Sequence, residues 1–476
     1  MFRSTKIVAT VGPASTSEKM LDRLLQAGVD VFRLNFSHGE LADKAATIAT
    51  IRELSRRHRK AVAILGDLQG PKIRTGKMKE GALELVEGSD VTITTRDVLG
   101  EGALFSTIYQ ELPHDVQPGD QILLDDGLLE LKVTAVAGSD VTCRVITGGR
   151  LKDRKGINLP GVAVSAPALT EKDREDLDFC IAQELDYVAL SFVRRSADVT
   201  ILRELIDQQQ SGIRIISKIE KPEAVESFAE ILELSDGIMV ARGDLGVEIS
   251  AEKVPLIQKK IIRECNKAGK PVITATQMLE SMIGNPRPTR AETSDVANAI
   301  LDGTDAIMLS GETAAGKYPV EAVEVMAKVA LDVERDMHYA ESPVRLRHGA
   351  NGETDMTEAI GLGACRIADA IGAKAILAFT QTGHTAALVT KYRPGIPIYA
   401  VTPSHFVRRR MALYAGVRSI RVDIEGTTEA QISSVEKAVL EAGVLQGGDI
   451  AVITMGSPLS DPGTTNLIKV HRLSEK

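Results

Sequence analysis

Residues 214–246, RIISKIEKPEAVESFAEILELSDGIMVARGDLG, decide the fold of this chain. Two short apolar runs, at residues 215–216 and 238–240, are typical of buried strands. The segment between them, Glu223–Leu234, has the periodicity of a helix. The order of strand, helix and strand predicts a βα repeat with parallel strands.

Both of these strands end in charged residues. Lys218 and Glu220 lie two positions apart and therefore face the same side of the first strand, while the second strand ends at Gly243 and Asp244. Two carboxylates among oxygen ligands suit Mg²⁺, and a lysine suits a developing anion. The alternative for Lys218 and Glu220 alone is a solvated salt bridge at a strand end. That alternative is disfavoured because the adjacent strand also ends in charged residues.

Six further apolar runs have the same character, at residues 7–10, 29–36, 61–65, 187–192, 271–275 and 305–309. Together the eight runs predict parallel strands that are each followed by a helix, which is the pattern of a TIM barrel in the α/β class. The active site of such a barrel lies at the carboxyl ends of its strands. Here those ends carry Arg33, Asn35, Asp67, Lys218, Glu220, Asp244, Thr276 and Glu312. For Glu312, a carboxylate that caps or orients its neighbours is an equally good interpretation.

Two changes of pattern divide the chain. Helical periodicity disappears between about residues 76 and 161, which predicts a small antiparallel β domain inserted into the barrel. A linker near residues 336–353, with a Pro and Gly residues, precedes a last α/β unit. We therefore expect a discontinuous barrel domain at 1–75 and 162–340, an inserted β domain at 76–161 and a C-terminal α/β domain at 350–476.

The composition excludes several classes of protein. A net charge of −8, 3% aromatic residues and no Trp argue against a nucleic-acid or membrane-surface binder. The one dense basic run, residues 408–410, is either a local anion contact or a solvated helix face. The four cysteines lie far apart, without zinc or disulfide spacing, and are expected to be reduced core residues. No signal peptide or membrane-spanning run is apparent, so we expect a cytoplasmic protein with no nucleic-acid or membrane partner.

Eight segments of the chain carry specific motifs: KIVATVGP (6–13), FRLNFSHG (32–39), GPKIRTG (70–76), SKIE (217–220), DGIMVARGDLGVE (236–248), TATQMLESM (274–282), PRPTRAETSDVANA (286–299) and MLSGETAAG (308–316). With them the chain resembles pyruvate kinase over nearly its whole length. The resemblance implies a homotetramer in which each TIM barrel carries an inserted small β-barrel that closes as a lid, and a C-terminal α/β effector domain. It also implies phosphoryl transfer from phosphoenolpyruvate to ADP, giving ATP and an enolate that is protonated to pyruvate.

The resemblance implies a role for each charged strand end. Glu220 and Asp244 would bind Mg²⁺ or Mn²⁺, and Lys218 would neutralise the phosphoryl group in transfer and the enolate oxygen. Arg33 would hold the phosphate as a planar fork. Thr276 would bind the substrate carboxylate and help to deliver the proton.

Backbone and nucleotide contacts follow from the same resemblance. The amides of Gly243 and Asp244 would bind the substrate carboxylate at a helix N-terminus. The lid would exclude water, with residues 125–127 as a contact at its tip. The phosphates of ADP and ATP would contact Arg74 and Lys155, with polar neighbours at Asn35 and His38.

Position 72 departs from the family pattern. Many members bind K⁺ through residues that correspond to Asn35, Ser37, Asp67 and the carbonyl of Leu68. Those members typically have Glu where this chain has Lys72. A lysine there can place its own ammonium near the phosphate, so we expect K⁺ to be dispensable. The alternative is a surface lysine without a role.

The C-terminal unit contains a second candidate site. Residues 380–385, TQTGHT, join a strand to a helix, and their hydroxyls and amides suit a phosphate. The family binds its sugar-phosphate effector here, which implies ligands among Thr380, Thr382, Gly383, His384 and Thr385. Members that bind fructose 1,6-bisphosphate tend to have basic residues at the positions of Gln381 and of residues 440–442. A hexose or pentose monophosphate or AMP is therefore expected, with a vestigial loop as the alternative.

Two other functions compete with this interpretation. Another barrel enzyme acting on phosphoenolpyruvate or pyruvate would share the carboxylates, but it would not need the inserted domain, Arg74 or Lys155. A non-catalytic effector-binding homologue would be expected to lose Lys218 or a metal ligand, and this chain retains them.

Overall fold

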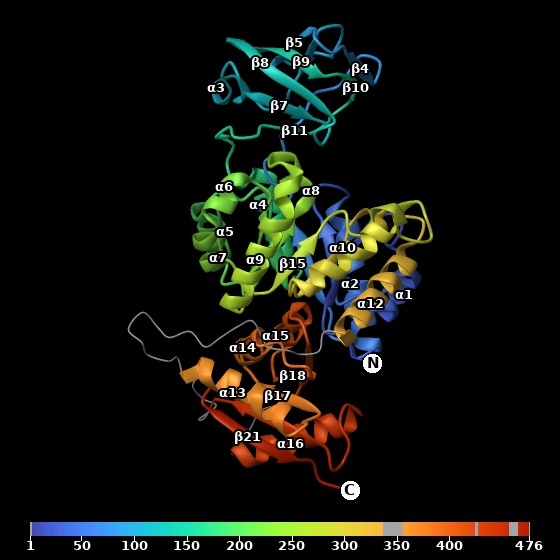
Figure 1. Ribbon diagram of the computed structural model, residues 1–476, viewed down its shortest axis with the longest axis vertical. Coiled ribbons are helices and arrows are strands. Elements are labelled where there is room, and N and C mark those ends of the chain that lie inside the picture. The colour runs from blue at the N-terminus through green and yellow to red at the C-terminus, as the bar shows by residue number, and fades with distance from the viewer. Residues whose placement is uncertain (1, 337–355, 424–426, 457–464, 476) are drawn as a thin grey trace.

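The structure, a computed structural model, describes residues 2–336, 356–423, 427–456 and 465–475. Three bodies are stacked along the long axis, with the inserted strands at one end, the barrel in the middle and the C-terminal unit at the other end (Figure 1). The expected linker at 336–353 lies, apart from Asp336, outside the described residues. No helix among the described residues is both long and apolar enough to cross a bilayer.

The middle body is a closed barrel of parallel strands in the order β1-β16-β15-β14-β13-β12-β3-β2, which confirms the predicted TIM barrel. Its interior is filled by small and branched apolar side chains, among them Val8, Val31, Ile216 and Ile273. The strands are β1 (Lys6–Val11), β2 (Val31–Asn35), β3 (Ala63–Asp67), β12 (Tyr187–Leu190), β13 (Arg214–Ile219), β14 (Gly237–Ala241), β15 (Val272–Ala275) and β16 (Ala306–Leu309).

Helices surround the barrel. They are α1 (Glu18–Ala27), α2 (Leu41–Arg57), α4 (Glu171–Ala182), α5 (Ser196–Gln208), α6 (Pro222–Glu226), α7 (Phe228–Leu234), α8 (Arg242–Glu248), α9 (Val254–Ala268), α10 (Arg290–Leu301), α11 (Gly311–Ala314) and α12 (Pro319–Asp336). The single helix predicted at 223–234 is wrong, because Ser227 ends α6 and precedes α7. Ala224, Phe228 and Ile231 are all buried, so the apolar spacing continues across the break and hides it.

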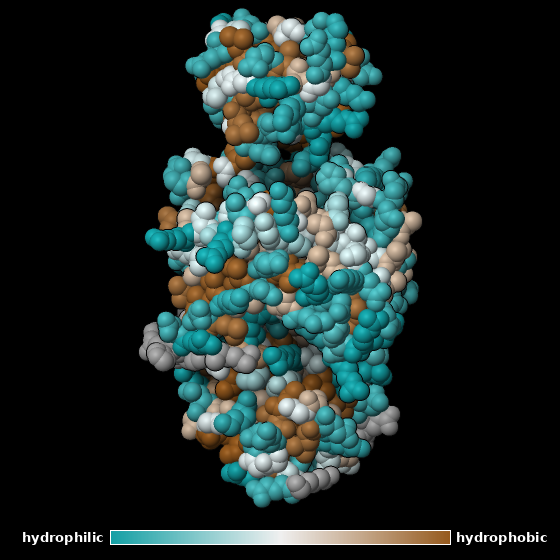
Figure 2. Space-filling view, turned by 90° about the vertical axis from the view of Figure 1, so that its right-hand side faces the viewer, coloured by the Kyte–Doolittle hydropathy of each residue, from teal (hydrophilic) through white to brown (hydrophobic). Residues whose placement is uncertain are grey.

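The inserted strands form a six-stranded sheet, β11-β7-β8-β9-β5-β6, and a two-stranded sheet, β10-β4. Their bounds are β4 (Ala82–Leu85), β5 (Asp90–Thr94), β6 (Leu104–Ser106), β7 (Gln121–Leu124), β8 (Leu129–Ala137), β9 (Asp140–Thr147), β10 (Gly149–Lys152) and β11 (Ile157–Asn158), with the short helix α3 (Leu112–Asp115). Where the chain enters and leaves this body, Thr75 N donates to Lys155 O at 2.8 Å and Ile157 N to Ile73 O at 3.0 Å. The two crossings are therefore one paired hinge, at the narrow waist in Figure 2.

The C-terminal unit is a five-stranded sheet in the order β19-β18-β17-β20-β21, with only β21 antiparallel. Its elements are α13 (Met356–Ala370), β17 (Ala375–Phe379), α14 (His384–Lys391), β18 (Ile398–Thr402), α15 (His405–Arg410), β19 (Val417–Arg421), α16 (Thr428–Glu441), β20 (Ile450–Met455) and β21 (Leu467–Arg472). Sequence reasoning missed β19, because its arginines conceal a short edge strand.

The C-terminal unit contacts the end of the barrel opposite the inserted strands. Ala412 and Leu413 pack into the apolar cluster that fills the barrel. Arg409 Nε donates to Asp186 Oδ1 at 2.7 Å, in agreement with the first of the two interpretations of residues 408–410, a local anion contact. The four cysteines are free and buried, as predicted.

Candidate active site

The residues predicted from the strand ends converge around Lys218, near the carboxyl end of β13. Its Nζ lies 2.8 Å from Glu220 Oε1 and 3.4 Å from Asp67 Oδ1, and it donates to Ser191 Oγ at 2.7 Å. The Lys218 side chain is only 12% exposed, and the two carboxylates are more deeply buried. A buried ammonium is thus held between two carboxylates at the barrel mouth.

Burial and charge set the ionisation of this group. Burial acts to lower the pKa of Lys218, but the charges of Asp67 and Glu220 outweigh it and raise the pKa above its usual value. Burial raises the pKa of Glu220, which Lys218 opposes and the nearby charge of Asp244 reinforces. Lys218 therefore remains a cation at neutral pH, and the carboxylates of Glu220 and Asp244 repel each other.

Arg33 on β2 is placed by two neighbours. Its Nε donates to Asp67 Oδ2 at 2.6 Å and its Nη1 to Thr10 Oγ1 at 3.0 Å. Burial would raise the pKa of Asp67, but the charges of Arg33 and Lys218 lower it below its usual value. Asp67 is therefore an anion that positions both cations, and the structure brings all three together.

The loop after β15 places Thr276. Gly243 N donates to Thr276 Oγ1 at 2.7 Å, and the hydroxyl of Thr276 donates to Ala275 O at 2.6 Å. Thr276 and Gln277 both have positive φ, at 67° and 54°, a backbone conformation that is uncommon for residues other than glycine. The first turn of α8 and this strained loop thus form one unit.

Sequence reasoning missed Arg242, which holds that loop. Its guanidinium donates to Thr276 O at 2.7 Å and to Ala275 O at 3.3 Å, and it pairs with Asp295 Oδ2 at 2.7 Å. No spacing rule predicts bonds from a side chain to carbonyl oxygens more than thirty positions away. The motif at 236–248 was the only available signal.

Ser191 and Phe192, which follow β12, were also missed. Phe192 N donates to Glu220 Oε2 at 2.7 Å, with Phe192 in a positive-φ conformation of 56°. Ser191 Oγ lies 3.3 Å from Asp67 Oδ1 and donates to Leu68 O at 2.7 Å. Both residues orient predicted ligands through hydrogen bonds.

Glu312 has a structural role, in agreement with one of its two interpretations. Its side chain is fully buried, and its oxygens accept from Ser310 N at 2.7 Å and Leu279 N at 3.1 Å. These bonds fasten the loop after β16 to the loop after β15.

The donor set fits a divalent cation. Glu220 and Asp244 supply oxygen ligands, the preferred donors of Mg²⁺. Their repulsion, which contributes to the raised pKa of Glu220, is relieved by a cation between them. Within the described residues no group of three or more His, Cys, Asp and Glu side chains forms a metal cage, so bound substrate and water would complete the ligands.

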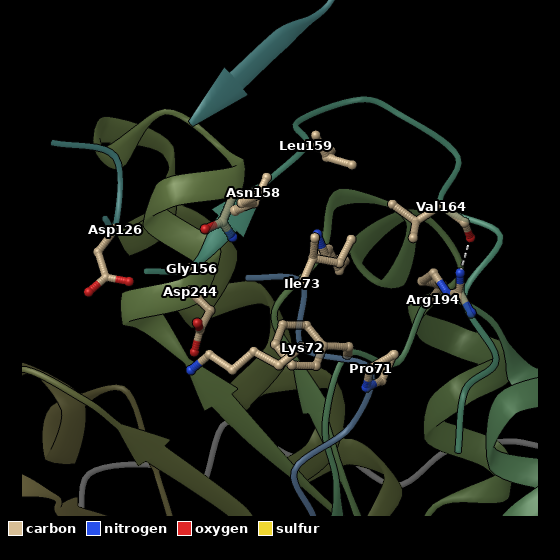
Figure 3. Close-up of a pocket in the computed structure, with 13 residues that line it drawn as sticks. Pro71, Lys72, Ile73, Asp126, Gly156, Asn158, Leu159, Val164, Arg194 and Asp244 are labelled. Atoms are coloured by element: carbon tan, nitrogen blue, oxygen red, sulfur yellow. Dashed lines mark hydrogen bonds between the residues drawn. The ribbon is translucent and has the colours of Figure 1, made fainter. Parts of the chain in front are cut away.

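Several basic side chains, among them Lys72 and Arg74, lie near His38 where the hinge meets the barrel mouth. Lys72, Ile73, Asp126, Asn158 and Asp244 line one pocket, and the Lys72 side chain extends toward Asp244 in Figure 3. Burial lowers the pKa of His38, and the charges of Arg74, Lys72 and Lys44 lower it further. His38 is therefore a neutral side chain close to cations.

Two of the predicted nucleotide contacts are held at the hinge. Arg74 Nη1 donates to Arg154 O at 3.2 Å, and Lys155 Nζ pairs with Asp125 Oδ1 at 2.7 Å. Residues 125–127 all have positive φ, so they form a tight tip on the loop before β8. The structure thus brings Arg74, Lys155 and this tip to the hinge.

The residues predicted to bind K⁺ lie at the ends of β2 and β3. Asn35 is aligned with Asp67 in the strand register, and Asn35 Oδ1 accepts from Ser37 N at 2.9 Å. Leu68 O accepts from Ser191 Oγ, and Asp67 is balanced by Arg33 and Lys218. Most of these oxygens therefore already have protein partners.

The loop at 380–385 is only partly open to a ligand. Thr380 is buried, and its Oγ1 accepts from Gly383 N at 2.8 Å. Thr385 is also buried, and its hydroxyl contacts that of Thr465 at 3.0 Å. Thr382 and His384 are exposed beside the start of α14.

Two family models match the chain. One, described as pyruvate kinase, barrel domain, matches residues 2–323, and the other, described as pyruvate kinase, alpha/beta domain, matches residues 358–471. Among curated proteins, a pyruvate kinase from Staphylococcus saprophyticus is 49% identical over all of this chain and 81% of that protein. One from Staphylococcus aureus strain USA300 is 48% identical over the same shares. The crystal structure of a pyruvate kinase from Cryptosporidium parvum superposes with a TM-score of 0.90 at 40% identity, covering 99% of this chain and 96% of that one.

Proposed function

The chain belongs to the pyruvate kinase family, and we propose that the mouth of its barrel catalyses that family's reaction with Lys218 as the central cation. The enzyme is a phosphotransferase that converts phosphoenolpyruvate and ADP into pyruvate and ATP, the last step of glycolysis. The observation that supports the residue assignment is the Lys218 ammonium, 2.8 Å from Glu220 and 3.4 Å from Asp67.

The residues act mainly by position and charge, as is usual in phosphoryl transfer. Glu220 and Asp244 would hold Mg²⁺, which would supply positive charge to offset the negative charge of the reacting groups. Lys218, kept protonated by its carboxylate neighbours, balances the charge of the phosphoryl group in flight. Arg33 binds the phosphate through the part of its guanidinium that Asp67 and Thr10 leave free.

The backbone around α8 binds the other end of the substrate. The amide of Asp244 receives the carboxylate at the first turn of the helix, and the amide of Gly243, now bonded to Thr276 Oγ1, exchanges that oxygen for the carboxylate when substrate binds. The Thr276 hydroxyl, which now donates to Ala275 O, turns to donate to this carboxylate once Gly243 N has released it. From there it directs a water that protonates the enolate carbon.

The inserted strands, residues 76–161, act as a lid over the nucleotide. Arg74 and Lys155 lie on the paired hinge and contact the ADP phosphates, with Asn35 and His38 beside them. Closure excludes water, which would otherwise accept the phosphoryl group. Lys155, now paired with Asp125, exchanges that carboxylate for phosphate oxygens when ADP binds.

The family generally needs Mg²⁺ and K⁺, and we propose that this enzyme differs in the second requirement. The Lys72 ammonium lies near enough to His38 to lower the pKa of that imidazole. It therefore supplies a positive charge at the barrel mouth without K⁺. Family membership also favours a cytoplasmic homotetramer.

A lactate-dehydrogenase-coupled assay with phosphoenolpyruvate, ADP and Mg²⁺ tests the function. Pyruvate production that requires ADP is expected. A lyase or aldolase would release product without ADP, and a non-catalytic homologue would release none. Either of those outcomes would contradict the proposal.

The effector loop is proposed to bind a monophosphate. Thr382 and His384 carry exposed side chains, whereas Thr380 and Thr385 are committed to internal hydrogen bonds. This small number of donors suits one phosphate group better than two. At sub-saturating phosphoenolpyruvate, ribose 5-phosphate, glucose 6-phosphate or AMP is expected to increase the rate severalfold, and Thr382→Ala to abolish the response. Activation by fructose 1,6-bisphosphate alone would refute the preference.

A further inference from the structure

Glu248 is a buried carboxylate that has no role in the proposed reaction. Glu248 is the last residue of α8, and its side chain is only 1% exposed. A carboxylate at the C-terminal end of a helix is unfavourable because the helix dipole is negative there. A buried charge also loses its hydration and needs partners to compensate. Its placement therefore calls for a specific reason.

The partners of Glu248 come from two different parts of the site. Lys221, which directly follows Glu220 and precedes α6, forms an ion pair with Glu248 Oε1. Asn158 Nδ2, 90 positions away in sequence, donates to the same oxygen at 2.7 Å. The second oxygen, Oε2, is buried and has no hydrogen-bond partner among the described residues. An ion pair with Lys221 alone would not require a residue of the inserted strands.

Asn158 belongs to the hinge. It ends β11, the last inserted strand, one residue after Ile157, whose N–H pairs with Ile73 O across the two crossings. The tip of the inserted strands also lies close to α8, because a side-chain carbon added at Gly127 would be 3.6 Å from Val247 Cγ1. The last turn of α8 therefore contacts the inserted strands at the hinge, through Asn158 and Glu248, and lies close to the tip.

The other end of α8 carries Gly243 and Asp244. The helix is only seven residues long, so a displacement at Glu248 is transmitted directly to its first turn. We propose that Glu248 is a positioning residue, which ties the lid hinge through Asn158 to the helix that carries Asp244. The tie couples the orientation of the lid to the geometry of the metal ligand and of the amides that bind the substrate carboxylate. This inference rests on the proposed closure of the lid over the nucleotide.

Asn158→Ala tests the tie without leaving Glu248 unpaired, because Lys221 remains. We expect the KM for ADP to rise about fivefold and the Mg²⁺ concentration for half-maximal rate to rise about threefold, although Asn158 is not a proposed metal ligand. Arg96→Ala, which removes the exposed Arg96–Asp140 pair within the inserted strands, is the matched control and should change neither value. Glu248→Gln combined with Asn158→Ala should be no worse than the more impaired single variant.

The distance between the lid and the barrel is a second measurement, and a change in the stability of the fold alone would not alter it. Dyes on cysteines introduced at the exposed residues Lys132 and Lys328 report the distance from lid to barrel, because the four native cysteines are buried. Addition of ADP should shorten this distance less in Asn158→Ala than in the parent. Kinetics within twofold of the parent, additive effects in the double variant, or identical closure would overturn the tie. A parent enzyme inactive with phosphoenolpyruvate and ADP would instead contradict the proposed function.

Discussion

Replacement of Lys218 by Met is expected to lower kcat by about a thousandfold or more, the size expected when a preorganised charge contact to a transition state is lost. The physical reason is that Lys218 is a desolvated cation, 12% exposed and held between Glu220 and Asp67. Met fills a similar volume without the charge. The KM for phosphoenolpyruvate should change much less than kcat, because the contact strengthens as negative charge develops. Steady-state kinetics with the coupled assay measure both quantities.

The fold and the metal site need separate checks in this variant. Removal of the ammonium leaves two buried carboxylates less balanced, so stability is followed by thermal unfolding and metal binding by titration with Mn²⁺. Divalent-ion affinity should not fall, since Lys218 is not a proposed ligand and its loss removes a cation that lies 2.8 Å from Glu220. Lys328→Met, at an exposed position of α12, is the matched control and should retain full activity. A Lys218→Met enzyme with near-normal kcat would exclude Lys218 from catalysis.

The charged strand ends could be predicted because the residues that form each strand and its end are neighbours in the sequence. A βα repeat places the ends of all its strands at one mouth, so Lys218, Glu220 and Asp67 had to approach one another. The ends of α1 depend on equally local contacts, because Ser17 Oγ accepts from Met20 N and Gly28 N donates to Leu24 O, each within one turn.

The residues that were missed act over long sequence distances. Arg242 bonds to carbonyl oxygens of another loop, and Asn158 meets Glu248 from 90 positions away. Neither contact produces a periodic pattern in the sequence, because any polar side chain can bond to a carbonyl or carboxylate oxygen if the fold brings the two together. The break at Ser227 was hidden for a different reason, since the helices on either side keep the same buried face. Local patterns thus locate the reacting groups, whereas the groups that orient them require the tertiary structure.

Position 72 offers the second large effect. The parent enzyme should lose less than about tenfold of its activity when K⁺ is replaced by tetramethylammonium, because the Lys72 ammonium remains as a compact cation at the mouth. Lys72→Glu removes that cation and adds a carboxylate near Asp244, as the shared pocket indicates. Without K⁺, this variant should be at least a hundredfold less active than the parent. Addition of K⁺ should restore most of the loss, because an alkali cation suits the carboxylate and carbonyl oxygens there.

Two further variants separate the role of Lys72 from a general effect of charge. Lys77→Glu makes the same change at an exposed position just beyond the hinge, and it should remain independent of K⁺. Lys72→Met removes the cation without supplying a new ligand, so K⁺ should rescue it less well than Lys72→Glu. Equal rescue of both position-72 variants would mean that K⁺ is held by Asn35, Ser37, Asp67 and Leu68 regardless of residue 72. A parent enzyme that loses more than tenfold without K⁺ would show that the ammonium does not replace the ion. If Lys72 does replace it, the cation requirement of this active site is decided by one side chain on the segment that enters the hinge, and the ligands around Lys218 need not change.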